Sequence, residues 1–301
     1  MKLKTLLLAG LFIQIAFAQD FEKVKPQDLR SSVDFLSSDV LKGRETATQG
    51  ELVAAQFIRS KFIEAGIKPY FNTYFDTFES TRFKGVNVVG FIEGSDPELK
   101  DEIVILGAHY DHIGLGPKVK NDSIANGAND NASGTAAVLA IANRLARLGT
   151  NKRSVIVALF SGEEKGLLGS KYYAENPIYP LENTIANLNV DMIGRIDDYH
   201  DNSDYVYLIG SDRLSTELHQ ISEDVNKQHF NLELDYKFNE EDDPNRYYYR
   251  SDHYNFAKNN IPVIFYFNGI HADYHKTSDT VDKIHFKKIQ KISRYIFLTA
   301  W

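Results

Sequence analysis

Apolar positions along the chain follow two patterns that alternate. Four short apolar runs lie at positions 103–106, 155–160, 188–190 and 263–267, interrupted only by Asn189, and residues 87–92 also have a strand-like composition. Runs without polar alternation are typical of strands buried on both faces of a sheet. Apolar residues recur at helical spacing between most of these runs, over residues 134–148, 165–174 and 214–228, and again over 286–298. The alternation predicts an α/β fold with a mainly parallel, mixed central sheet and helices on both faces.

Two more helices are predicted before the first strand, over residues 27–41 and 51–65, with glycines at positions 43 and 66 after them. The segment 233–250 is polar and rich in tyrosine, which predicts a surface lobe or loop over the edge of the sheet. No internal repeat or low-complexity segment divides the chain. Residues 19–301 are therefore expected to form a single domain.

The first residues have the pattern of an export signal. Lys2 and Lys4 precede an apolar run over residues 6–17, and Ala16-Phe17-Ala18 matches a cleavage site. This run is shorter than the roughly 18 apolar residues that a membrane span needs. We expect a signal peptide at residues 1–18 and an exported protein, periplasmic or secreted, without a membrane span in the mature chain.

Composition excludes several kinds of chemistry. The 41 acidic residues outnumber the 34 lysines and arginines, giving a formal net charge of −7, which argues against nucleic acid as a partner. The chain has no cysteine, so disulfides, thiolate metal sites and thiol catalysis are ruled out.

Polar residues with metal-binding side chains follow each of the four apolar runs. They are His109, Glu163 with Glu164, Asp191, and His275. Because ligands bind beyond the carboxyl ends of parallel strands, we expect these side chains to share one cleft. A glycine-rich turn at 127–134 adds Asp130, for which helix capping is the competing explanation. His112 lies farther beyond its strand than His109 and is the weaker ligand candidate.

Histidine and carboxylate ligands without cysteine suit zinc in an open, catalytic site. Two histidines and three carboxylates are too many for one such ion, but two ions about 3.5–4 Å apart can share them through one bridging carboxylate. One acid of the Glu163–Glu164 pair is then spare and can act as a general base. Manganese or cobalt could occupy the same ligands.

The sequence resembles the M28 family of zinc-dependent aminopeptidases, whose fold is that of the zinc exopeptidases. The resemblance lies in ordered motifs that cover nearly all of the mature chain. The motifs are Gly107-Ala-His-Tyr-Asp-His112, Gly127-Ala-Asn-Asp-Asn-Ala-Ser-Gly134, Phe160-Ser-Gly-Glu-Glu-Lys-Gly-Leu-Leu-Gly-Ser170, Asn189-Val-Asp-Met-Ile-Gly194, Arg250-Ser-Asp-His253 and Asp273-Tyr-His275. Leu41-Lys-Gly-Arg44 is similar to the family's N-terminal pattern.

The resemblance implies a role for each residue. His109 and Asp191 would bind one of two zinc ions, Glu164 and His275 the other, and Asp130 would bridge them. Glu163 matches the general base, and Asp111 the acid that orients His109. Tyr274 is a candidate donor to the oxyanion, and Ser251 a candidate partner of His275.

The implied reaction removes the first residue from peptides with a free N-terminus. Arg246 and Arg250 could contact the main chain of the substrate or form surface salt bridges.

Glutaminyl cyclases share the fold and much of the ligand set but work with one zinc. Dipeptidase or carboxypeptidase relatives remain open, as does an exported metal-binding protein without catalysis, although such a binder has no use for Glu163. The chain has no Gly-x-Ser-x-Gly motif, which disfavours serine hydrolysis.

Overall fold

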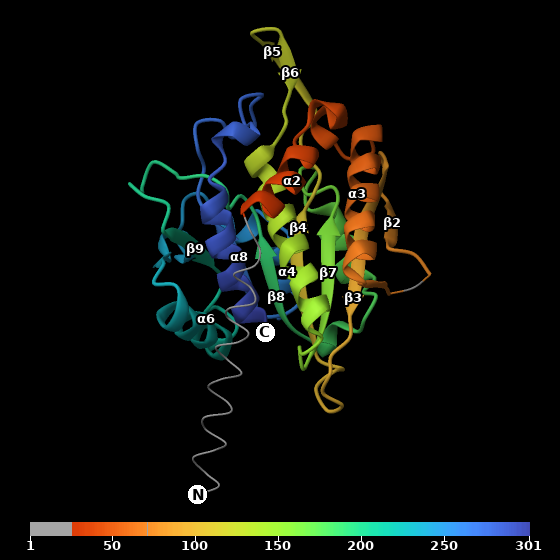
Figure 1. Ribbon diagram of the computed structural model, residues 1–301, viewed down its shortest axis with the longest axis vertical. Coiled ribbons are helices and arrows are strands. Elements are labelled where there is room, and N and C mark those ends of the chain that lie inside the picture. The colour runs from red at the N-terminus through yellow and green to blue at the C-terminus, as the bar shows by residue number, and fades with distance from the viewer. Residues whose placement is uncertain (1–25, 71) are drawn as a thin grey trace, which may run out of the picture.

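The computed structural model describes residues 26–70 and 72–301, and its centre is a mixed sheet (Figure 1). The sheet has nine strands in the order β1-β3-β7-β4-β8-β11-β9-β10, and β2 also pairs with β3. Their bounds are β1 Lys68–Pro69, β2 Phe75–Glu79, β3 Lys84–Ile92, β4 Ile103–His109, β7 Ser154–Phe160, β8 Thr184–Val190, β9 Tyr205–Ile209, β10 Glu233–Asp235 and β11 Val263–Phe267. A separate hairpin, β5 Leu115–Val119 and β6 Asp122–Ile124, projects from one end of the molecule (Figure 1).

The four strands predicted from apolar runs form the parallel centre of this sheet. Strand β4 pairs in parallel with β7 and β8, and β8 pairs in parallel with β11. Antiparallel pairing joins β3 to β7 on one side and β9 to β11 on the other. Because β7, β4, β8 and β11 all point the same way, their carboxyl ends lie at one edge of the sheet. The predicted mixed, mainly parallel α/β class is confirmed.

Helices cover both faces of the sheet. One face carries α2 Pro26–Leu36, α3 Gln49–Ala65, α4 Gly134–Leu148 and α8 Phe286–Ala300, and α6 Thr216–His229 packs on α8 (Figure 1). The other face carries α5 Leu168–Glu175 and α7 His253–Ala257, which pack on each other and on β3, β8 and β11. Short helical turns are η1 Asp39–Arg44, η2 Ala128–Ser133, η3 Leu181–Asn183, η4 Lys237–Asn239, η5 Tyr247–Tyr249 and η6 Val281–Lys283.

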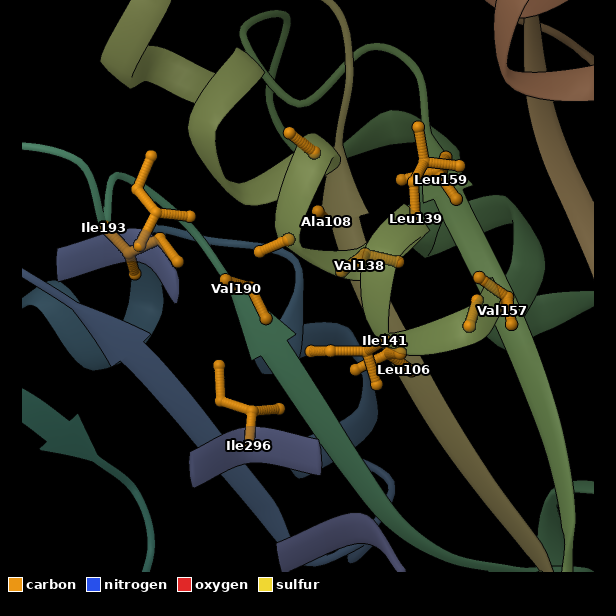
Figure 2. Packing of buried hydrophobic residues seen from close by; sticks show 14 of the residues in the cluster. Leu106, Ala108, Val138, Leu139, Ile141, Val157, Leu159, Val190, Ile193 and Ile296 are labelled. Atoms are coloured by element: carbon orange, nitrogen blue, oxygen red, sulfur yellow. The ribbon is translucent and has the colours of Figure 1, made fainter. Parts of the chain in front are cut away.

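The main core lies between the sheet and helices α4 and α8. Val138 and Ile141 of α4 face Leu106 of β4, while Val190 of β8 and Ile296 of α8 lie beside them (Figure 2). Burial of such side chains stabilises the folded state by about 25 cal/mol for each Å² of apolar surface removed from water. The core therefore fixes α4, and with it the η2 turn at the start of α4, against the ends of the central strands.

Several predicted segments differ from the structure. The helix expected over 27–41 ends at Leu36, because the hydroxyls of Ser37 and Ser38 donate to the carbonyls of Val33 and Phe35 and compete with continued helix. Strand β9 was not predicted. The segment 233–250 is not only a surface lobe, since β10 extends the sheet and Phe238 and Tyr247 are buried.

The predicted signal peptide lies outside the described residues. Within the part of the chain that the structure describes, no helix combines the length and apolar character needed to cross a membrane.

Candidate metal centre

Side chains from four strand ends and one helix start meet at the carboxyl edge of the sheet. His109 is the last residue of β4, and Asp191 directly follows β8. Glu163 and Glu164 lie in the turn after β7, and His275 lies beyond β11. Asp130 comes from the η2 turn that precedes α4. The structure thus brings together all six of these residues.

They form two groups of ligand atoms. One group holds His112, Asp130, Glu164 and His275, and the other holds His109, Glu163 and Asp191; within each group the atoms lie within 4.8 Å of one another. Asp130 reaches both groups. Its Oδ1 is 3.4 Å from His109 Nε2, and its Oδ2 is 3.0 Å from His275 Nε2. One carboxylate therefore lies between two sets of histidine and acid.

These donors fit a bound divalent cation. Four carboxylates and three imidazoles converge in these two groups. Buried carboxylates are unfavourable unless a cation or hydrogen bonds compensate them. Nitrogen and oxygen donors without sulfur are ligands for zinc in an open site.

The loop that carries Asp130 is held from two sides. The buried guanidinium of Arg44 donates to the carbonyls of Gly127 at 2.7 Å and Asp130 at 3.1 Å. On the other side, the Asp279 carboxylate accepts hydrogen bonds from the backbone N–H groups of Asn129 and Asp130. Both contacts restrain the backbone at Asp130, so its carboxylate is positioned before any ion binds.

His109 is surrounded by acids. Burial alone lowers the pKa of His109, but the carboxylates of Asp191 and Glu163 outweigh this effect and raise the pKa well above its usual value. Its Nε2 lies 3.2 Å from Asp191 Oδ1. Its Nδ1 lies 3.2 Å from the carbonyl oxygen of Asp111 and 3.6 Å from the Asp111 carboxylate, so Asp111 stands on the far side of the ring. The Thr46 hydroxyl donates to that carboxylate at 2.7 Å.

The adjacent acids Glu163 and Glu164 face different groups and have opposite pKa shifts. Burial raises the pKa of Glu163 well above its usual value, and nearby Glu164 and Asp191 raise it further against the opposing effect of His109. Burial also raises the pKa of Glu164, but hydrogen bonds with His112 and His275 bring it below its usual value. The two adjacent acids therefore differ in proton affinity, which is the higher at Glu163.

Ser251 does not contact His275, which corrects the partner expected from sequence. Its hydroxyl donates to Asp191 Oδ2 at 2.9 Å and accepts from the side-chain amide of Asn189. Ser251 lies two residues before α7, which packs on β8, whereas His275 approaches from the loop beyond β11. The serine therefore supports a residue at the end of β8.

A small cavity of about 40 Å³ opens on the same residues, and half of its lining residues are apolar or aromatic. We call it the apolar cavity. Met192, Tyr247, Phe265, Phe267, Ile270 and Tyr274 line it together with His109, Asp130, Glu163, Glu164, Asp191 and Arg250. The Tyr274 ring stacks on His275 with centroids 3.9 Å apart. Arg250 contributes to the lining, while Arg246 is exposed, does not line the cavity and stacks over Tyr249.

Two residues near the site were not selected from the sequence. His112 Nδ1 lies 2.9 Å from Glu164 Oε1 and 3.7 Å from Asp130 Oδ2, within the second group. Asp252 is fully buried, and burial raises its pKa to about 7 against the opposing effect of His109. The motifs 107–112 and 250–253 contain both, but only their neighbours were assigned.

Solved structures with this fold are zinc exopeptidases and related enzymes. LapA aminopeptidase of Legionella pneumophila aligns over 95% of this chain and 74% of its own, with a TM-score of 0.74 at 20% identity. A glutaminyl cyclase of Porphyromonas gingivalis aligns over 91% of this chain and 97% of its own, with a TM-score of 0.72 at 16% identity. At such identities the likeness establishes the fold, and the expected zinc-exopeptidase architecture is confirmed.

The sequence places the chain in a family within that fold. Residues 87–300 match the model of peptidase family M28, and the chain belongs to this family. Leupeptin-inactivating enzyme 1 of Streptomyces exfoliatus is 30% identical over 236 residues, which cover 78% of this chain and 46% of that protein. The chain thus spans less than half the length of this relative.

Proposed function

We propose that the protein is an exported metallo-aminopeptidase that binds two zinc ions and removes N-terminal residues from peptides. The observation that carries the proposal is the position of Asp130 between two histidine–carboxylate groups, with Glu163 close by. His109, Asp191 and one Asp130 oxygen would hold one ion. The other Asp130 oxygen, Glu164 and His275 would hold the second.

When bound, a pair of zinc ions polarises the scissile carbonyl and lowers the pKa of a water molecule. Glu163 accepts the proton from the attacking water and later donates it to the leaving amine. Its raised pKa suits the second step, because a carboxyl group that readily holds a proton can also deliver it. Asp111 orients His109 from the opposite side of the ring.

Tyr274 would donate a hydrogen bond to the oxyanion. Burial and the nearby Asp130 and Glu164 carboxylates raise the pKa of Tyr274, so the hydroxyl remains protonated. A protonated hydroxyl stabilises negative charge only by donating, which is the role required in the transition state. Stacking on His275 fixes the direction of the ring.

The apolar side chains that line the apolar cavity would contact the side chain of the first residue. Phe265 and Phe267 of β11, with Met192 and Ile270, supply its apolar surface. The free substrate amine lies among carboxylates, which favour a positive charge. Arg250 lines the same cavity and would contact the substrate's main chain, whereas Arg246 would serve only a surface contact.

The chain is proposed to act after export. Residues 1–18 would be removed as a signal peptide, and residues 19–301 would form one peptidase domain in the periplasm or outside the cell. The shared fold makes glutaminyl cyclisation the competing reaction, but two ligand groups joined by Asp130 favour the two-ion peptidase. The reaction products separate these possibilities.

Mass spectrometry of peptides incubated with the purified mature protein tests the proposal. One peptide would be supplied with a free N-terminus, with an acetylated N-terminus and with N-terminal glutamine, each with and without a chelator. Stepwise loss of single residues from free N-termini only, stopped by the chelator, is expected. Loss of ammonia without shortening would identify a cyclase, and release from the C-terminus a carboxypeptidase. No change in any peptide, with zinc present in the sample, would favour a binding protein.

A further inference from the structure

A second, larger cavity lies beside the metal centre. It has a volume of about 880 Å³ and lies between the β2–β3 hairpin, residues 45–46 and the start of α5. Phe78, Phe83, Leu168 and Tyr172 give it an apolar floor, and Arg82 and Lys165 are among the charged residues at its sides. We call this cavity the leaving-side groove. Its size is within the range of cavities that hold extended small ligands.

The groove and the apolar cavity meet at Glu164, which lines both. They lie on opposite sides of the site in the sheet order. The apolar cavity is built from β11 and its neighbours, whereas the groove is built from β2, the turn that follows β2, and residues 164–175 after β7. A peptide whose first side chain contacts the apolar cavity can therefore continue across Glu164 toward the groove.

The groove has a fixed shape. The rings of Phe78 and Tyr172 stack with centroids 5.7 Å apart. Gly85 allows this arrangement, because a Cβ there would lie 2.2 Å from the Phe78 ring. At the hairpin tip, the Ser80 hydroxyl accepts hydrogen bonds from the backbone N–H groups of Arg82 at 3.2 Å and Phe83 at 3.1 Å. The turn thus holds Arg82 at the groove through its backbone alone.

Four carboxylates (Glu45, Glu79, Glu164 and Glu175) and three cations (Arg82, Lys165 and Lys171) line the groove, and two of these cations are paired with acids. Lys165 pairs with Glu45 at 2.6 Å, and Lys171 lies 3.9 Å from Glu175. The exposed guanidinium of Arg82 has no acidic partner among the residues that the structure describes. Arginine presents several donors in a fork that matches a carboxylate.

We propose that the leaving-side groove binds the part of the peptide that follows the scissile bond, and that Arg82 pairs with a carboxylate of that part. This inference rests on the proposed aminopeptidase function. The carboxylate is either the C-terminus of a short peptide or an acidic side chain in a longer one. The groove then favours peptides over substrates that end at the scissile bond.

Steady-state kinetics on four leucine substrates tests this inference. Leucine p-nitroanilide has no leaving peptide. Leu-Ala-Ala carries a C-terminal carboxylate, Leu-Ala-Ala-amide carries none, and Leu-Ala-Glu-Ala-amide carries one on a side chain. Arg82→Gln is the test variant, because the turn does not use its side chain, and Arg59→Gln on the exposed surface of α3 is the matched control.

The wild type is expected to prefer at least one carboxylate-bearing peptide over the amide. Arg82→Gln should lower kcat/KM for that peptide about two- to five-fold, the range of an exposed charged pair, and leave leucine p-nitroanilide and the amide unchanged. The substrate whose kcat/KM falls shows whether Arg82 pairs with a C-terminal carboxylate or with a side-chain carboxylate. Arg82→Glu should lower kcat/KM for this peptide further than Arg82→Gln, and Arg82→Lys should restore part of the loss.

Equal kinetics for Arg82→Gln and Arg59→Gln on all four substrates would overturn the inference. An equal loss on leucine p-nitroanilide would also overturn it, since that substrate does not reach the groove. A wild type that cleaves none of the four substrates would instead contradict the proposed function, so the two failures are distinguishable.

Discussion

Replacing Arg44 with alanine is expected to destabilise the protein strongly. The side chain is fully buried, and its guanidinium donates to five backbone carbonyls. The acceptors are the carbonyl oxygens of Tyr110 at 2.8 Å, Leu36 at 2.9 Å, Asn126 at 2.5 Å, Gly127 at 2.7 Å and Asp130 at 3.1 Å. Burial lowers the pKa of Arg44 to about 10 against the opposing Asp130 and Asp279 carboxylates, so it remains charged at pH 7.

The magnitude follows from these contacts. Each buried carbonyl left without a donor costs about 1–3 kcal/mol, but water entering the space vacated by Arg44 would replace some of the bonds. Removing one partner of a buried ionic contact costs about 3–5 kcal/mol in total. For a chain of this size, that corresponds to a fall in Tm of about 6–20 °C. Arg44→Lys is expected to lie between wild type and alanine, because one ammonium cannot reach all five acceptors.

Thermal and urea unfolding of metal-free protein measure this effect without a contribution from bound ions. Arg153→Ala is the matched control, since Arg153 pairs with Glu102 while both side chains are 40% exposed. Such a pair contributes less than about 1 kcal/mol. A free energy of unfolding for Arg44→Ala within 1 kcal/mol of that control would refute the reasoning, because it would show that the five carbonyls find other donors.

Three further predictions concern the centre and its surroundings. His112→Ala should weaken binding of one zinc ion about ten-fold or more in competition with a chromophoric chelator, whereas His229→Ala on the surface should not; unchanged affinity would show that His112 acts only in packing. Burial raises the pKa of Glu51 from 4.5 to about 8, so its contribution to stability is full below pH 4.5 and is lost as the pH rises to 8. Glu51→Gln should therefore make the Tm less dependent on pH between pH 5 and 8.5. A pH profile of the Tm parallel to that of the wild type would contradict the raised pKa of Glu51. Chelation should lower the Tm and added zinc should restore it, because ions that bind only the folded state stabilise that state. A Tm that the chelator leaves unchanged would argue against a bound ion.

The centre of the fold could be predicted from sequence because its signals are local. The apolar runs of β4, β7, β8 and β11 report burial on both faces, and the mixed sheet was confirmed. Strand β9 was missed because its tyrosines can be buried only with distant partners. The hydroxyl of Tyr205 donates to the Asn268 carbonyl, and that of Tyr207 to Asp197. Nothing close in sequence shows that these hydroxyls are satisfied.

In the site, too, local signals could be predicted from sequence and contacts between distant segments could not. The strand ends indicated which side chains would gather, and the structure brings His109, Asp130, Glu163, Glu164, Asp191 and His275 together. Supporting contacts could not be predicted because they join distant segments. Asp279 accepts from the Asp130 backbone 149 positions away, and Ser251 reaches Asp191 across 60 positions. Such pairs follow from how loops meet beyond the sheet, which no local pattern records.

The central claim is that two zinc ions and a separate base, Glu163, act together. It is tested most directly by measuring zinc per chain and peptide turnover on the same samples of wild type, Glu163→Gln and Glu164→Gln. Two zinc ions are expected in the wild type and in Glu163→Gln, with turnover of the latter lower by about 10²–10⁴-fold. Glu164→Gln should lose one ion. A single ion in the wild type, or Glu163→Gln that retains full turnover, would contradict it.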